Sequence, residues 1–377
     1  MSSIKTPIWK AEDHTIAKLE ILRSYMLAWV PILARNSRVP LMYIDGFSGP
    51  GEYSNGVDGS PIVVSKAIHE SLSNCLDKVS CSKVICLFIE ADKRRYCSLL
   101  EKVNQLSDSS ISCRCIYGKF EDKIKELRLL YSSHIGGDSP LFVFVDPFGV
   151  KGIPLDVLKL CMEGKRSELL INLDVDGIAR VYAANYKQQL SQIFGDDSCV
   201  EELDIDTFSS MSDKGLRILE LYKRQLRQLV GVKYTYQFEM RGNSDRINYY
   251  LVFASNHKKG LIRMKEAMKK VDQYGDFCFS DANSHQRLLF EKNSLEDNIL
   301  KIKNRFMDRE VSLGEVEDFA LCETTLSSIS RALKSMEASG AIHVNVRGGV
   351  KRRRGSFLDE QISSIRFTKE TTQPMLF

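Results

Sequence analysis

Short, nearly continuous apolar runs recur through the first half of the chain, and they constrain its fold more than any other feature. Runs that are apolar on both sides fit the interior strands of a parallel sheet, which helices cover on both faces. Amphipathic stretches separate the runs, so strand and helix alternate along the chain. We therefore expect an α/β fold with a mostly parallel sheet. The runs are residues 41–44, 84–89, 112–117, 141–145 and 168–173.

A helix and a hairpin flank this set of strands. Residues 15–34 carry apolar side chains at helical spacing and predict a leading helix. Residues 234–240 and 249–255 flank a turn-forming segment and predict an antiparallel hairpin. Five parallel strands followed by a hairpin is the chain order of a class I methyltransferase, which has a Rossmann-like sheet. A plain dinucleotide-binding fold favours one more parallel crossover.

Two connections in this region also predict helices. Ser60 followed by Pro61 resembles a helix N-cap with proline at the first helical position, and this helix is expected to run towards Ser73. Residues 178–230 predict a long helical region, which we interpret as an insertion.

The remainder of the chain has a different rhythm, and we expect a sheet domain at residues 1–275 and a second domain at 290–377. The second stretch predicts three helices and then two strands joined by a basic loop, which is the order of a winged helix. The helices are expected at 295–307, from Ser312 with Glu315 completing a capping box, and at 323–338; the strands are expected at 341–346 and 363–368.

Composition excludes several classes of protein. Of 377 residues, 43% are hydrophobic and 27% are charged, as in an ordinary globular domain. The start of the chain lacks the apolar region of a secretory signal, and no apolar run approaches the roughly 20 residues that span a bilayer. We therefore expect a cytoplasmic protein. Cys113 and Cys115 are the only close cysteine pair, and their spacing does not suit zinc, so we expect no metal.

The segment after the first apolar run predicts a cofactor loop. Asp45 ends the run, and the glycines that follow allow a turn whose backbone a ligand can approach closely. The pattern D-x-F-x-G-x-G resembles the S-adenosylmethionine (SAM) loop of nucleic-acid methyltransferases rather than the G-x-G-x-x-G of dinucleotide binders. An ordinary glycine-rich turn is the alternative. The candidate cofactor-binding residues here are Asp45, Gly46, Phe47, Ser48, Gly49 and Gly51.

The second and third runs end in further cofactor candidates. Glu90 and Ala91 follow the second run, at the sheet edge where open α/β sheets bind ligands, and an acidic side chain there accepts both ribose hydroxyls. Asp92 is a rival for that role or a cap for the next helix. Phe120 and Glu121 follow the third run and are candidates to contact the adenine, although Glu121 also suits the first turn of a helix.

The fourth run carries the most specific signal, because it ends abruptly in Asp146-Pro147-Phe148-Gly149. An isolated buried carboxylate is costly, so Asp146 needs a partner or a task. In methyltransferases that act on exocyclic amines, an acid or amide followed by proline and an aromatic accepts hydrogen bonds from the target amine. The aromatic ring stacks on the base, which must leave its own stack.

We therefore assign Asp146, Pro147 and Phe148 as catalytic residues, with a simple strand-ending turn as the alternative. The motif departs from the common D-P-P-Y form and resembles that of transfer-RNA guanine-N2 methyltransferases, which leaves the base open. Other polar residues are less specific. His14 is expected to cap the first helix, and Asn172, Asp174 and Asp176 are candidates to line the pocket.

Several stretches, spread over nearly the whole chain, together resemble one known family. They are His14-Thr15 with Lys18, residues 43–51, 59–61, 144–149 and 249–257, Lys259-Gly260, and residues 264–268. The family is the three-Cys-motif partner (TcmP) family. This resemblance implies a bacterial protein often encoded beside a radical-SAM-like protein of the phage Gp37/Gp68 type. The three cysteines belong to that neighbour, so the resemblance implies no iron–sulfur site in this chain.

Basic residues of the second domain predict nucleic-acid binding. A winged helix usually lays its third helix in the major groove and its wing beside phosphates. Basic side chains at both places neutralise phosphates and make binding salt-dependent. A winged helix used for protein contacts or dimerisation is the alternative. The candidate residues are Arg331, Lys334, Arg347, Lys351, Arg352, Arg353 and Arg354.

Together these features predict a SAM-dependent methyltransferase that acts on an exocyclic amine of a nucleic-acid base in DNA or RNA. One alternative is a catalytically silent scaffold that binds SAM or another nucleotide, or a nucleic-acid-binding partner of the radical-SAM-like protein. A methyltransferase acting on a small molecule is another. No cluster of carboxylates or histidines suggests the metal pair of a phosphodiester-cleaving enzyme.

Overall fold

The computed structural model describes residues 8–75, 83–134, 137–147, 149, 152–283, 294–348 and 350–368. The chain divides into two compact units. The first comprises residues 1–273 and 277–287, and the second comprises residues 274–276 and 288–377. Among the described residues, no helix is both long enough and apolar enough to cross a membrane.

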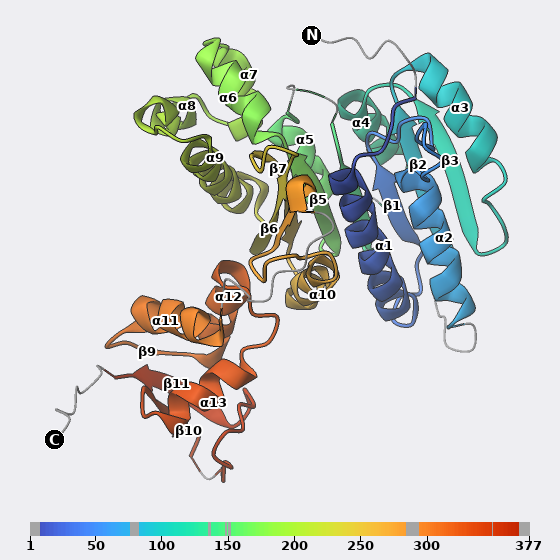
Figure 1. Ribbon diagram of the computed structural model, residues 1–377. Helices are drawn as coiled ribbons and strands as arrows, with labels where there is room; N and C mark the ends of the chain where they lie inside the picture. Colours follow the sequence, from blue (N-terminus) through green and yellow to red (C-terminus); the bar gives the residue numbers. More distant parts are fainter. Residues whose placement is uncertain are drawn as a thin grey trace. The chain divides into compact units, whose positions relative to one another are not determined.

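The first unit is built around an eight-stranded sheet in the order β3-β2-β1-β4-β5-β7-β6-β8 (Figure 1). Strands β1 to β5 are parallel, whereas β7 is antiparallel to both β5 and β6. The prediction of a mostly parallel sheet with a hairpin is confirmed, and the fold is a Rossmann-like α/β fold. The strands are β1 (Leu41–Asp45), β2 (Val84–Glu90), β3 (Ile111–Tyr117), β4 (Leu141–Val145), β5 (Ser167–Leu173), β6 (Tyr234–Arg241), β7 (Ile247–Ser255) and β8 (Cys278–Ser280).

Helices cover both faces of this sheet. On one face α1 packs against α2 and α10, and Figure 1 shows α1 and α2 running side by side. On the other face α5 packs against α4, α7 and the π-helical turn η3. The helices are α1 (Asp13–Ala34), α2 (Ser60–Ser73), α3 (Lys93–Val103), α4 (Phe120–Leu130), α5 (Leu155–Met162), α6 (Val175–Ala183), α7 (Lys187–Phe194), α8 (Asp197–Leu203), α9 (Met211–Gln225) and α10 (Lys258–Lys269), with short turns η2 (Ile205–Thr207), η3 (Leu226–Val230) and η4 (Asp281–Asn283).

The two faces divide the side chains of each interior strand. Tyr43 and Phe142 stack with ring centroids 6.0 Å apart beneath α1, where Tyr25 meets the Phe142 ring at 5.2 Å. Their neighbours Ile44 and Val143 belong to the apolar cluster on the opposite face. Burying a side chain of this size contributes about 1.5–3 kcal/mol, so both faces stabilise the sheet. Because β1, β2, β4 and β5 are parallel, their carboxyl ends meet at one edge.

The second unit has its own apolar core and a three-stranded antiparallel sheet in the order β10-β11-β9. Helices α11 and α13 contribute Phe306 and Leu333 to this core, and β11 contributes Ile365. The elements are α11 (Leu295–Phe306), β9 (Glu310–Val311), α12 (Leu313–Glu323), α13 (Ser330–Ala338), β10 (Ile342–Val346) and β11 (Ile362–Phe367).

Two local predictions for this unit need correction. The helix expected from residue 323 begins only at Ser330, because the Thr324 hydroxyl donates to the Ala320 carbonyl and accepts from the Leu326 amide. Such local bonds compete with the helix ladder and end α12 there. At the start of α12 Ser312 caps as expected, but the Glu315 carboxylate pairs with Arg309.

Candidate functional site

The turn after β1 is held by a buried carboxylate. Asp45 is fully buried, and it accepts hydrogen bonds from the Ser60 hydroxyl (2.6 Å) and the Phe47 amide (3.1 Å). The sequence predicted Ser60 as the N-cap of α2, and this prediction is wrong. Gly59 occupies the N-cap position, and the hydroxyl of Ser60 ties the start of α2 to the end of β1.

Glycines in this turn permit close packing that no other residue would allow. A Cβ atom at Gly46 would lie 2.7 Å from the Phe120 ring, and one at Gly59 would lie 2.9 Å from the Gly51 carbonyl group. Gly51 also has a φ of 85°, which favours glycine. The Phe120 ring is buried against Gly46 and Phe47, so it forms part of the core beneath the turn.

Burial also changes the acidity of Asp45. Loss of hydration raises the pKa of its carboxyl to about 7, although the hydrogen bonds from Ser60 and the Phe47 amide oppose this rise. Near neutral pH, Asp45 therefore exchanges between its neutral and charged forms. A cation placed beside it would favour the charged form.

Glu90, at the end of β2, braces the same turn. Its carboxylate is nearly buried and accepts from the amides of Gly49 (2.9 Å) and Asp92 (2.7 Å), one on each oxygen. Each carboxylate oxygen can accept a second hydrogen bond, so the group retains capacity for a ligand. Asp92 caps α3 by accepting from the Arg94 and Arg95 amides, which settles its role as a cap. Ala91 between them is exposed.

Asp146 follows β4 and is held by two distant residues. Lys18 of α1 donates to one of its oxygens at 2.5 Å, and the Asn172 side-chain amide of β5 donates to the other at 2.6 Å. The Lys18 ammonium also lies 5.5 Å from the centre of the Tyr249 ring. The side chains of Lys18 and Asp146 are only 8% and 15% exposed, so water screens their attraction little. Asp146 is thus fixed in place beside a cation.

These residues border a polar cavity of about 310 Å³ at the carboxyl ends of β4 and β5. Two buried oxygens on its wall, Asn172 Oδ1 and the Tyr249 hydroxyl, have no hydrogen-bond partner among the described residues. Burial and the nearby Asp146 carboxylate raise the pKa of Tyr249, so its hydroxyl stays protonated. Trp9, His14, Thr15, Lys18, Tyr53, Asp146, Pro147, Gly149, Asn172, Asp174, Asp176, Asn248 and Tyr249 line the cavity.

His14 lies in this wall in a role that the sequence did not predict. Glu12 is the N-cap of α1, so His14 is not the cap but the second helical residue. Its Nδ1 atom lies 2.6 Å from an oxygen of Asp281, and its ring meets the Tyr249 ring edge-on at 5.7 Å. The contact fastens the start of α1 to the turn after β8.

The remaining candidate residues have structural roles or lie outside the described residues. Asp174 caps α6 through the Gly177 amide, and Asp176 pairs with Arg180 at 2.8 Å. Glu121 lies in the first turn of α4. Phe148 lies outside the described residues. Among the described residues, no group of three or more His, Cys, Asp or Glu side chains could hold a metal ion.

Three residues that line the cavity, Lys18, Tyr53 and Asn248, were not predicted from the sequence as site residues. Lys18 carried a usable signal, because it occupies the same helical stripe as Leu22, Tyr25 and Trp29, which face the core. A lysine on an apolar stripe needs a buried acidic partner. Tyr53 and Asn248 carried no such signal, since neither stands in a recognisable pattern.

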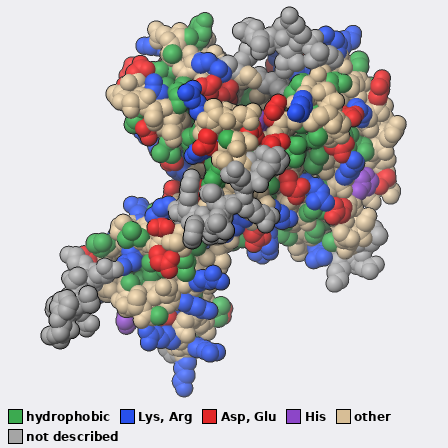
Figure 2. All heavy atoms as spheres, viewed as in Figure 1, with side chains coloured by type: hydrophobic (Ala, Val, Ile, Leu, Met, Phe, Trp, Pro, Cys, Tyr) green, Lys and Arg blue, Asp and Glu red, His purple; other side chains and the backbone are tan. Residues whose placement is uncertain are grey.

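In the second unit, basic side chains gather over the loop between β10 and β11 (Figure 2). Arg352 differs from the others, because its guanidinium pairs with both oxygens of Glu337 at 2.8 Å and is 7% exposed. This pairing lowers the pKa of Glu337, and the charge of Arg352 secures the loop instead of projecting into solvent. The exposed basic residues are Arg331, Lys334, Arg347, Lys351, Arg353 and Arg354.

Comparison with known proteins assigns neither a family nor a function to the chain. No family model and no curated protein matches the chain. A candidate methyltransferase structure from Porphyromonas gingivalis W83 is similar over 61% of this chain and 40% of its own, with 14% identity and a TM-score of 0.27. A candidate zinc-dependent alcohol dehydrogenase from Rhodobacter sphaeroides is similar over 62% of this chain and 99% of its own, with 12% identity and a TM-score of 0.22. At these scores neither similarity bears on function.

Proposed function

We propose that this protein is a SAM-dependent methyltransferase whose acceptor is an exocyclic amine of a nucleic-acid base. The observation that carries the proposal is the fixed Asp146 carboxylate at a polar cavity, beside two buried oxygens without partners. The strand order supports it, because five parallel strands followed by an antiparallel hairpin strand inserted beside β5 is the arrangement of class I methyltransferases.

The residues after β1 and β2 fit the cofactor. The two oxygens of Glu90 each keep capacity for one more hydrogen bond, which matches the two hydroxyls of a ribose. The carboxyl of Asp45 has a pKa of about 7, so a ligand that carries positive charge can favour its ionised form. SAM supplies a methyl group on a sulfonium, whose departure leaves a neutral thioether. The protein's own task is then to place and orient the acceptor.

The cavity residues fit an amine acceptor. An exocyclic NH₂ group offers two N–H donors, and Asp146 and Asn172 Oδ1 present acceptors on the same wall. Accepting these hydrogen bonds draws electron density towards the amine, so that its nitrogen can attack. Lys18 holds the Asp146 side chain in place, which fixes the hydrogen-bond acceptor before the reaction. Pro147 and Gly149 line the same cavity, which is where the target base is expected to rest.

The second unit supports a polymeric substrate. Its order of helices, two final strands and an intervening basic loop is that of a winged helix, and we include that fold in the proposal. The exposed basic residues on α13 and on the loop after β10 offer charges for phosphates. Binding through phosphates is expected to weaken steeply as salt concentration rises.

A catalytically silent binder is favoured by one observation, which is that both oxygens of Asp146 already have protein partners. One experiment separates the two functions. The purified protein is incubated with SAM labelled in its methyl group and with total RNA or DNA, and the polymer is then digested to nucleosides and analysed by mass.

A labelled nucleoside carrying the methyl group on an exocyclic nitrogen supports the enzyme. If calorimetry shows SAM binding but no polymer is labelled, the proposed nucleic-acid acceptor is wrong. Label on a carbon or ring nitrogen would contradict the assigned role of Asp146.

A further inference from the structure

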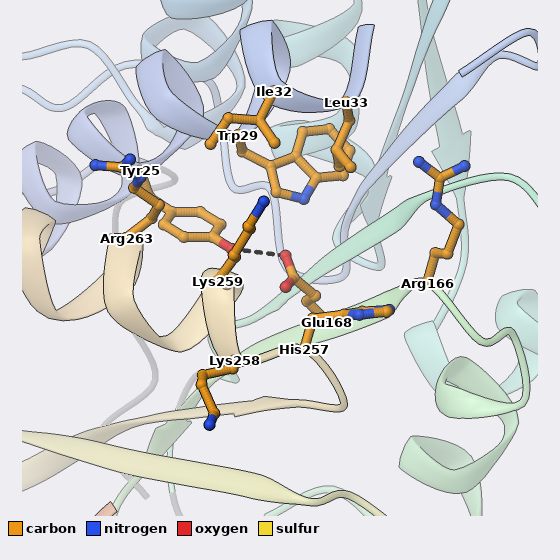
Figure 3. Close-up of a pocket in the computed structure, with 11 residues that line it drawn as sticks. Tyr25, Trp29, Ile32, Leu33, Arg166, Glu168, His257, Lys258, Lys259 and Arg263 are labelled. Atoms are coloured by element: carbon orange, nitrogen blue, oxygen red, sulfur yellow. Dashed lines mark hydrogen bonds between the residues drawn. The ribbon is translucent and has the colours of Figure 1, made fainter. Parts of the chain in front are cut away.

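A second cavity, of about 340 Å³, lies at the opposite end of the same sheet. Figure 3 shows the residues that line it. It is built by α1, the start of β5 and the first turns of α10, all within the first unit. Glu168, near the start of β5, lies on its floor. Asn172 of the candidate methyl-transfer site is four residues further along the strand, a separation of roughly 13 Å at the rise of a β-strand. The two cavities therefore belong to different ends of the sheet.

The floor of this cavity is a buried carboxylate. Glu168 is 4% exposed and accepts from the Tyr25 hydroxyl at 2.6 Å, drawn as a dashed line in Figure 3, and from the Ser255 hydroxyl at 3.0 Å. Each bond uses a different oxygen, so each oxygen can accept one more. A Cβ atom at Gly260 would lie 2.0 Å from one of these oxygens, so only glycine lets α10 approach the carboxylate so closely.

A buried donor lies beside this acceptor. The indole nitrogen of Trp29 is buried without a hydrogen-bond partner among the described residues. Figure 3 shows it directed into the cavity on the side of Glu168. A buried N–H group without a partner is costly, so a ligand that accepts from Trp29 gains a stabilising bond.

The walls of the cavity are apolar, whereas its rim is positively charged. The rings of Tyr25 and Trp29 and the aliphatic side chains of Ile32 and Leu33 form an apolar slot that suits a flat ring system. The rim is cationic, since Arg166, Lys258, Lys259 and Arg263 surround the opening. A ligand that satisfies both must be flat and aromatic at one end and anionic at the other.

We infer that this cavity binds a nucleotide whose base presents adjacent N–H donors to Glu168 and whose phosphate lies on the basic rim. Guanine carries its N1–H and 2-amino donors side by side, with the O6 acceptor next to them. Glu168 matches the two donors, and the Trp29 N–H matches the acceptor. Adenine lacks this pattern, because its N1 is an acceptor and would face the carboxylate. A lone phosphate would leave Glu168 and the apolar slot unused, and a cationic ligand would be repelled by the rim.

The fluorescence of Trp29 tests this inference. The chain has two tryptophans, so a Trp9→Phe protein reports on Trp29 alone. Titration with guanosine monophosphate is expected to change the emission saturably. Adenosine monophosphate is expected to bind at least about tenfold more weakly, because unpaired polar groups would be buried. Guanosine without phosphate should also bind more weakly, and inorganic phosphate should give no saturable change. Equal affinities for the guanine and adenine nucleotides would overturn the inference.

Two variants assign the contacts. Glu168→Gln should weaken binding of guanosine monophosphate about tenfold or more and remove the preference over adenosine monophosphate. Glu163→Gln, at an exposed position paired with Arg128, is the matched control and should change neither. Arg263→Ala removes an exposed rim charge and should weaken the nucleotide but not the nucleoside. If the Glu168→Gln protein folds and binds guanosine monophosphate as tightly as the wild type, the inference is contradicted. If Glu168→Gln does not fold, unchanged binding of guanosine monophosphate by Arg263→Ala contradicts it instead.

The source of the nucleotide and the independence of the site are tested separately. An oligonucleotide with a 5′-terminal guanylate is titrated beside the free nucleotide. Tighter binding of the free form assigns a small-molecule ligand, and tighter binding of the oligonucleotide assigns a strand end; both keep the recognition chemistry. Saturating SAM should not displace the nucleotide, and Glu90→Ala should leave its affinity unchanged. The inference therefore survives even if the proposed methyl transfer does not.

Discussion

The turn after β1 and the turn after β4 both present a carboxylate at the same edge of the sheet, yet they are held in different ways. The carboxylates of the β1 turn, Asp45 and Glu90, bind amides and a hydroxyl of the turn and its two flanking helices. The carboxylate of the β4 turn, Asp146, binds side chains from α1 and β5, which are 128 and 26 residues away in sequence.

This difference separates two tasks. A carboxylate that accepts backbone amides shapes a turn and changes little when side chains elsewhere change. A carboxylate held only by other side chains can be aimed at a cavity, because its position depends on packed elements rather than on its own turn. Under the proposed function, the β1 turn holds the cofactor and the β4 turn orients the acceptor.

The largest expected effect is on the rate of methyl transfer, through the carboxylate of the β4 turn. Asp146→Asn removes the charge that faces the acceptor amine and should lower the rate of methyl transfer about 10²–10³-fold. SAM affinity, measured by calorimetry, should stay within about threefold, since Asp146 is not part of the β1 turn. Asp176→Asn is the control, because Asp176 lines the same cavity but pairs with Arg180. A loss of SAM binding with an intact transfer rate would reverse the comparison.

The next largest effect is on SAM affinity, through the carboxylates of the β1 turn. Glu90→Ala removes the side chain proposed to accept from the ribose hydroxyls, a contribution of about 1.5–3 kcal/mol, and should weaken SAM binding about 10–100-fold. The rate at saturating SAM should fall much less than in Asp146→Asn. Asp92→Asn is the matched control, since Asp92 is a neighbouring carboxylate that caps α3. If both variants weaken SAM equally, Glu90 acts only by shaping the turn.

A third variant tests how rigid the β1 turn is. Gly46→Ala places a methyl group 2.7 Å from the buried Phe120 ring, so the ring or the turn must move. We expect the free energy of unfolding in urea to fall by about 1–3 kcal/mol, as for other overpacked sites. Gly314→Ala is the control, because its nearest neighbour would be 4.0 Å away, within helix α12. That change should be neutral or stabilising.

The smallest expected effect concerns pH. Burial raises the pKa of Asp45 from 3.8 to about 7, so the folded protein holds this proton more tightly than the unfolded chain. The contribution of Asp45 to stability therefore declines as pH rises from about 4 to about 7. A cationic cofactor favours the ionised form, so SAM binding should tighten about tenfold between pH 6 and pH 8. Asp45→Asn should flatten this dependence, and a wild-type affinity independent of pH would contradict the assignment.

The sequence was sufficient for the sheet where burial is two-sided. The run predicted at residues 141–145 is β4 to the residue, because both faces of that strand are covered. By contrast, β8 and β9 span only three and two residues, which is too short for a periodic pattern to appear. The start of α13 was also misplaced, because the hydrogen bonds of Thr324 outweigh the local helical spacing.

For the site, the sequence indicated positions but not partners. Asp146 and Glu90 were chosen as candidates because each is an acidic residue at the end of an apolar run. The contacts from Lys18 and Asn172 to Asp146 could not be read, since they depend on how α1 packs over the sheet. Ser60 was assigned to the wrong task for the same reason: its partner lies on β1, not in its own helix.

Helix α1 covers one face of the sheet, and its residues also line both cavities. Lys18 reaches Asp146 at one end of the sheet, and Tyr25 and Trp29 line the Glu168 cavity at the other. Trp29 lies eleven positions after Lys18 along the helix, a length of about 16 Å. A ligand that moves α1 at one cavity can also move the lining of the other, and any such coupling is equal in both directions. The leading helix is therefore the element through which occupancy of one cavity can change affinity at the other.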